Sequence, residues 1–84
     1  MVEAAQIETD LLAFVRREVF ATHMDATLDT DLVAAGFDSM SLVRLLVFVE
    51  QTYGMWVPES EITGESLQNL RTLASTVARL LNAR

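Results

Sequence analysis

Apolar residues recur at every third or fourth position in three segments of the chain, a spacing that places them on one face of an α-helix. Segment 3–22 contains Ile7, Leu11, Phe14, Val15 and Val19, segment 38–53 contains Leu42, Leu45, Leu46, Val49 and Tyr53, and segment 70–81 contains Leu70, Leu73, Val77, Leu80 and Leu81. The pattern predicts three amphipathic helices that bury these faces together.

Residues typical of helix ends fall at the edges of these segments. Asp38 opens the second segment and Gly54 closes it, and Asn69 is suited to cap the last helix. Pro58 suits the first position of a further helix, but Gly64 follows so soon that only about one turn fits. The sequence therefore predicts an all-α fold, a four-helix bundle with a short third helix.

A long loop separates the first and second predicted helices, over residues 23–37. It is rich in Asp and Thr, and Leu28, Leu32 and Phe37 are its predicted apolar anchors. A connection of this length without regular structure is unusual in a compact domain unless it is functional. We therefore expect this loop to serve the function.

Composition narrows the possible classes of protein. A chain of 84 residues buries too little surface for two cores, which predicts a single domain over 1–84. With no cysteine, the core must come from apolar packing. The net charge of −6, with six arginines and no lysine, argues against nucleic-acid binding. Without a long apolar stretch or a signal peptide, a cytoplasmic protein that is not inserted in a membrane is expected.

Groups that could catalyse a reaction are scarce. His23 is the one histidine, and it has no nucleophile paired with it in the sequence, so it is interpreted as a solvated or capping side chain. No carboxylate or histidine cluster has the spacing of metal ligands, and no glycine-rich phosphate loop is present. We expect no catalytic residues and no resident metal, and hence no enzyme.

The distinctive motif is Gly36-Phe37-Asp38-Ser39-Met40, which places a serine at the opening of the second predicted helix. An Asp-Ser pair alone is explained by helix capping. Together with the long loop before it, Tyr53-Gly54-Met55-Trp56-Val57-Pro58 after it and the last helix, the motif resembles the acyl and peptidyl carrier proteins over nearly the whole chain.

This resemblance implies the four-helix fold of carrier proteins and a 4′-phosphopantetheine arm esterified to Ser39. It also implies a phosphopantetheinyl transferase that takes the arm from coenzyme A with a transient magnesium ion, near which Asp38 matches the family's aspartate. The positive end of a helix favours a phosphodiester at its first residue, so no basic cluster is needed there.

Helical periodicity also predicts a partner surface on the second helix. If Leu42, Leu45, Leu46 and Val49 face the core, Met40, Val43, Arg44 and Val47 point outward beside the serine. For Trp56 two interpretations stay open: an anchor in the core or loop, or a part of this surface.

The resemblance implies a carrier that delivers a thioester-bound group from a loading enzyme to downstream enzymes. Arg44 and the single acidic Glu50 on the second helix depart from carriers of fatty acid synthesis, and segment 62–70 looks like that of free-standing carriers of aminoacyl or unusual acyl units. We expect a monomeric aminoacyl or peptidyl carrier of nonribosomal or hybrid polyketide antibiotic synthesis, loaded by an adenylating or acyl-loading enzyme. The alternatives are an acyl carrier of fatty acid or polyketide type, a D-alanine carrier, and an unmodified helical adaptor.

Overall fold

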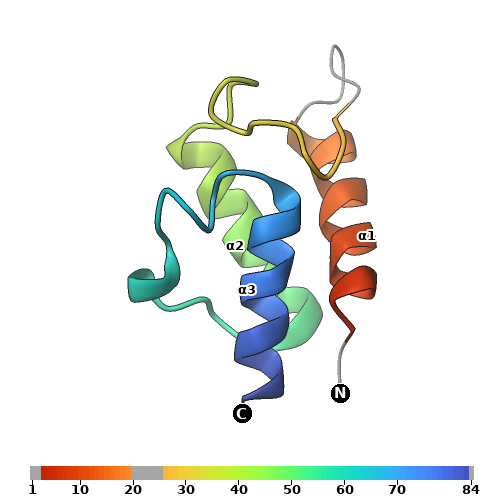
Figure 1. Ribbon diagram of the computed structural model, residues 1–84, viewed down its shortest axis with the longest axis vertical. Helices are drawn as coiled ribbons and strands as arrows, with labels where there is room; N and C mark the ends of the chain where they lie inside the picture. Colours follow the sequence, from red (N-terminus) through yellow and green to blue (C-terminus); the bar gives the residue numbers. More distant parts are fainter. Residues whose placement is uncertain (1–2, 20–25, 84) are drawn as a thin grey trace.

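The computed structural model describes residues 3–19 and 26–83, and every regular element in them is helical (Figure 1). In chain order the elements are α1 (Ala4–Phe14), the π-helix η1 (Val15–Val19), α2 (Ser39–Tyr53), the 3₁₀ turn η2 (Glu59–Glu61) and α3 (Leu70–Asn82). The all-α prediction is confirmed, with the four predicted helices present as three α-helices and one 3₁₀ turn.

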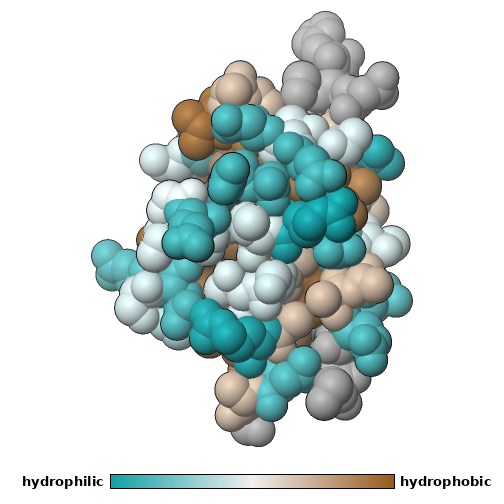
Figure 2. Space-filling model, viewed as in Figure 1, coloured by the Kyte–Doolittle hydropathy of each residue, from teal (hydrophilic) through white to brown (hydrophobic). Residues whose placement is uncertain are grey.

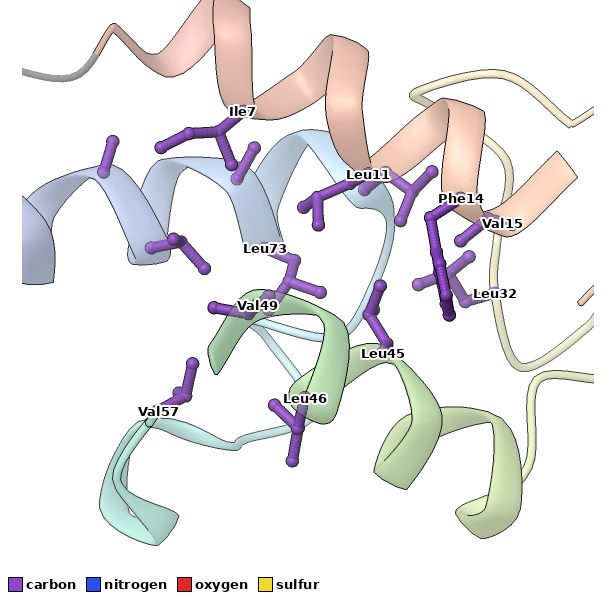
Figure 3. Packing of buried hydrophobic residues seen from close by; sticks show 14 of the residues in the cluster. Ile7, Leu11, Phe14, Val15, Leu32, Leu45, Leu46, Val49, Val57 and Leu73 are labelled. Carbon is purple, nitrogen blue, oxygen red and sulfur yellow. The ribbon is translucent and has the colours of Figure 1, made fainter. Parts of the chain in front are cut away.

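Helices α1 and α3 lie side by side along the long axis and run in opposite directions, and α2, drawn to the left of α3 in Figure 1, also packs against α1. Their apolar faces meet in one core, shown in Figure 3. Its fully buried large side chains are Ile7, Leu11, Leu32, Leu45, Leu70, Leu73, Val15, Val49, Val57 and Val77. The predicted inward face of α2 is confirmed for Leu45, Leu46 and Val49, whereas Leu42 is only partly buried.

The end of α2 and the start of α3 lie at the capping residues identified in the sequence. The Asn69 side chain accepts a hydrogen bond from the Thr72 N–H, and the Asn69 N–H donates one to the Thr72 hydroxyl oxygen, which makes a capping box. Gly54 ends α2 in the left-handed conformation, at φ 70°, which a glycine adopts without a steric penalty. These caps fix where α2 stops and where α3 starts.

The predicted third helix is a single 3₁₀ turn. Pro58 precedes it with φ −62°, and the N–H of Ile62 bonds to the Glu59 carbonyl, the i to i+3 pattern. The chain then turns at Ser66, whose hydroxyl donates to the Glu61 carbonyl at 2.7 Å. Three residues are too few to complete an α-helical turn with its longer hydrogen bonds.

The first helix differs from the continuous helix predicted over 3–22. It changes at Val15 into the π-helix η1, whose wider turn holds an extra residue. Within η1, the Arg16 side chain donates to the Ala26 carbonyl at 2.9 Å, so this turn is tied to the following loop. Residues 20–25, and with them His23, lie outside the described part of the chain.

The described part of the long loop, 26–38, is tied to the helices on both sides. Besides Arg16, the Arg71 backbone N–H bonds to the Leu28 carbonyl at 3.1 Å, and the Arg71 guanidinium makes two bonds to Asp29, at 2.8 and 3.0 Å. Leu32 is fully buried, and Leu28 and Phe37 pack against the core, so all three predicted anchors are confirmed. The loop therefore holds the start of α2 in a defined place.

Among the described residues, no helix has both the length and the apolar character needed to span a membrane.

Candidate functional site

Ser39 is the first residue of α2, and its side chain is exposed to solvent. Asp38 precedes it in an extended conformation, and its Oδ1 accepts hydrogen bonds from the Ser41 N–H at 2.9 Å and the Ser41 hydroxyl at 3.0 Å. Asp38 is thus the N-cap of α2, as the motif predicts. The cap holds the first turn of the helix, and with it Ser39, in a fixed orientation.

The cap also keeps the Asp38 carboxyl ionised. The bond from the Ser41 backbone N–H, followed by that from the Ser41 hydroxyl, lowers the pKa of Asp38 below its usual value, because both stabilise the charged form. A negative charge at a helix N-terminus is favoured by the helix dipole. An exposed carboxylate next to an exposed serine also leaves an oxygen accessible to a divalent ion brought by another protein.

The loop delivers the chain to this site through a tight turn. Gly36 has φ 95°, a conformation that suits glycine, and the Phe37 N–H bonds to the Leu32 carbonyl at 2.9 Å. Because Leu32 is buried, this bond ties the residue before Asp38 to the core. Ser39 is therefore an exposed side chain on a rigid support.

A hollow of about 320 Å³ lies against the serine. Its walls come from the long loop, the start of α2 and the segment before α3, and they are formed by Val33, Phe37, Asp38, Ser39, Leu42 and Leu67. Val33 is 75% exposed and was not identified from the sequence, since an isolated valine in a loop has no periodic pattern to mark it. Figure 2 shows hydrophobic surface in the upper left, where in Figure 1 the loop meets the start of α2.

The residues predicted to point outward are exposed: Met40 by 70%, Val43 by 52%, Val47 by 37%, Trp56 by 50%, and Arg44 as well. The core interpretation of Trp56 is wrong, because half of its side chain reaches solvent while Val57 beside it is fully buried. The alternation of side chains in this extended segment explains the difference.

Among the described residues, no group of three or more His, Cys, Asp or Glu side chains is arranged to hold a metal ion. The site is thus one exposed hydroxyl, one capped carboxylate and a helix N-terminus. Such a site suits a covalent attachment: a phosphodiester on the Ser39 hydroxyl would lie at the positive end of α2, and another protein can reach it.

Comparison with known proteins agrees with this chemistry. A family model described as a phosphopantetheine attachment site matches residues 17–80. The chain therefore belongs to this family of phosphopantetheine-dependent carrier proteins, and 4′-phosphopantetheine is its covalent cofactor. The predictions of family, fold and cofactor are confirmed.

Individual proteins similar to this chain include two named carrier proteins and one solved structure. Aminoacyl carrier protein 1 of Bradyrhizobium diazoefficiens is 40% identical over 53 residues, which span 63% of this chain and 59% of that protein. A D-alanyl carrier protein of Streptococcus suis strain 98HAH33 is 34% identical over 68 residues, 80% of this chain and 86% of that protein. A chain in a crystal structure of an FAD-dependent dehydrogenase superposes with TM-score 0.75 and 33% identity, over 80% of this chain and 97% of that one.

Proposed function

We propose that Ser39 carries the phosphopantetheine arm and that the protein holds an aminoacyl group on it as a thioester. The observation that carries the proposal is an exposed serine at the capped start of α2, in a chain of the phosphopantetheine-binding family. The thiol at the end of the arm forms the thioester, and the protein presents it. Asp38 assists the transfer of the arm by offering its free carboxylate oxygen to the magnesium ion of the transferase.

The similar proteins favour an aminoacyl cargo, since one is an aminoacyl carrier and another a D-alanyl carrier. The charge pattern of α2 agrees: Glu50 is its one acidic residue and Arg44 its one basic residue, which offers little to a strongly basic partner. A carrier of D-alanine is the second candidate, favoured by the Streptococcus suis protein.

The partners we infer are a phosphopantetheinyl transferase, an adenylating enzyme that loads the cargo, and enzymes that modify or take up the loaded group. A crystal structure of an FAD-dependent dehydrogenase contains a chain that matches 80% of this chain over 97% of its own length. Flavin-dependent oxidation of the tethered group therefore joins the candidate downstream reactions. The partner surface we propose is made of Met40, Val43, Arg44, Val47 and Trp56.

In this proposal residues 1–84 act as one monomeric, free-standing carrier domain of the cytoplasm with no catalytic residue of its own. The pathway we infer is specialised biosynthesis of the nonribosomal peptide or hybrid polyketide kind. The arm brings the cargo to each enzyme, and each enzyme supplies the chemistry.

Release of the native cargo tests the proposal. The protein and its Ser39→Ala variant are each isolated from the cells that make the protein, and thioesters are cleaved with hydroxylamine. We expect an amino acid hydroxamate from the parent and none from the variant. A long-chain acyl hydroxamate from the parent would contradict the aminoacyl cargo, and equal release from both would contradict attachment at Ser39.

A further inference from the structure

A groove of about 400 Å³ lies between the end of α1, η1 and the outward face of α2. The stacked rings of Phe14 and Phe48, with centroids 4.6 Å apart and planes at 23°, line it. Val43 and Val47 add exposed apolar surface from α2. The groove therefore offers an apolar recess of the size of a small ligand site, next to the helix that bears Ser39.

Two arginines, Arg17 and Arg44, line this groove. Three other arginines in the described part of the chain have side-chain partners. Arg16 donates to the Ala26 carbonyl, Arg71 binds Asp29, and Arg79 binds Glu61. The guanidinium groups of Arg17 and Arg44 make no hydrogen bond or ion pair within the described part of the chain, and both side chains line the groove and are exposed.

One acidic residue shares this lining. Glu18 belongs to η1 next to Arg17, and no described contact joins its carboxylate to either guanidinium. With two cations and one anion among its described residues, the lining has a local charge of the opposite sign to the net charge of −6. Two cations that have no partner among the described residues, beside exposed valines in an acidic chain, are complementary to a partner that brings both carboxylates and aliphatic side chains.

We propose that this groove docks an acidic, amphipathic helical segment of a partner enzyme. The inference rests on the proposed carrier function and names the chemistry of one of its partners. Helical rise puts Val43 about 6 Å and Val47 about 12 Å from Ser39 along α2. A partner seated in the groove thus holds the attachment point of the arm beside its own surface.

Two synthetic helical peptides serve as probes. One carries leucines along one face and glutamates along its edges, and the other has lysines in place of the glutamates. Each is titrated into the ¹⁵N-labelled full chain, and amide shifts are followed by NMR. The acidic peptide is expected to shift the signals of Arg17, Arg44 and Val47, and the lysine peptide is expected to leave them unchanged. Binding is expected to weaken as salt is raised toward 1 M, where the screening length falls to about 3 Å.

Variants separate the groove from general charge effects. Arg17→Gln/Arg44→Gln is expected to bind the acidic peptide about 2- to 30-fold more weakly, from two exposed ion pairs. Arg44→Gln alone, which leaves η1 untouched, is expected to bind more weakly as well. The control Arg79→Gln removes the same charge from α3 and is expected to bind as the parent does.

Equal binding of both peptides, an unchanged affinity of the Arg44→Gln variant, or shifts centred on Val33 and Trp56 would each overturn the inference. The titration is repeated on Ser39→Ala, which cannot be modified at that serine but retains the groove. Binding that persists in Ser39→Ala is the expected result, and its loss would overturn the inference. Failure of the carrier function appears instead as an absence of phosphopantetheine on the parent protein, so the two failures are distinguishable.

Discussion

The contact between Tyr53 and Asp10 joins α1 to the last residue of α2, and its removal has a calculable cost. The Tyr53 hydroxyl donates to Asp10 Oδ2 at 2.6 Å, while Gln6 Nε2 donates to Oδ1 at 2.9 Å. A hydrogen bond to a charged group contributes about 1.5–3 kcal/mol. Because both side chains are only partly buried, water replaces some of this bond, and we expect Tyr53→Phe to cost about 1 kcal/mol.

Thermal unfolding followed by circular dichroism measures this cost. For a chain of this size, 1 kcal/mol corresponds to a fall in Tm of about 4–8 °C. Asp10→Asn and the double variant complete a double-mutant cycle, which separates the bond itself from side effects of each substitution. The coupling free energy between the two positions is expected to account for most of the loss.

An alkaline titration gives a second readout. Burial, then the hydrogen bond to Asp10 and its charge, raise the pKa of Tyr53 above its usual value. A raised pKa in the folded state means that the contribution is present below the unfolded value of about 10 and is lost as pH rises toward the folded value. Tyr53 is the one tyrosine in the chain, so tyrosinate absorbance reports on this residue alone.

Two results would refute this reasoning. One is a Tyr53→Phe variant with the Tm of the parent, and the other is tyrosinate that forms at the pH of free tyrosine while circular dichroism still reports folded protein. In the first case the bond adds no stability, and in the second the hydroxyl is freely solvated.

Three further predictions concern α2 and α3. Leu45→Ala is expected to lower the free energy of unfolding by about 2–5 kcal/mol, since Leu45 is fully buried. Val43→Ala, on the exposed face of the same helix, is expected to lower it by less than about 0.5 kcal/mol. Urea unfolding measures both values. Asn69→Ala is expected to cost about 1 kcal/mol by the same assay through loss of the α3 cap, while Asn69→Asp retains it. Attachment of phosphopantetheine to Ser39 is expected to raise the pKa of Asp38, because a phosphodiester adds negative charge one residue away; carboxyl ¹³C NMR of both forms measures it.

Each of these has an outcome that contradicts it. Equal losses at Leu45 and Val43 would mean that α2 does not present one face to the core. An Asn69→Ala variant as stable as the parent would mean that the capping box is not formed in solution. A pKa of Asp38 that falls or stays constant on modification would place the phosphodiester away from the cap.

Local patterns in the sequence predicted most of the fold. Spacing of apolar residues located α1, α2 and α3, and Asp38, Gly54 and Asn69 marked their ends, because capping depends on neighbouring residues. The same periodicity separated the exposed Val43 and Val47 from the buried Leu45. Patterns of this kind need no knowledge of which segments meet in space.

Features that depend on distant residues were beyond the sequence. The hydrogen bonds from Arg16 to Ala26 and from Arg71 to Asp29 join segments that are separated in the sequence. No local pattern predicts that these segments are in contact. The groove lined by Arg17 and Arg44 likewise combines two helices: Arg44 was predicted to point outward, but no local pattern pairs it with Arg17. Trp56 was undecided because an extended segment after a helix can turn either face inward.

Attachment of the arm to Ser39 is the central claim, and mass spectrometry tests it most directly. The protein and the Ser39→Ala and Ser41→Ala variants are incubated with coenzyme A, magnesium and a broad-specificity phosphopantetheinyl transferase, and circular dichroism confirms that each is folded. Trypsin then cuts after Arg17 and Arg44, which releases a peptide whose two serines are Ser39 and Ser41.

We expect one added phosphopantetheine unit on the parent and on Ser41→Ala, none on Ser39→Ala, and fragment ions of peptide 18–44 that place the added mass on Ser39. An added unit on Ser39→Ala, or no added unit on the folded parent, would contradict attachment of the arm to Ser39.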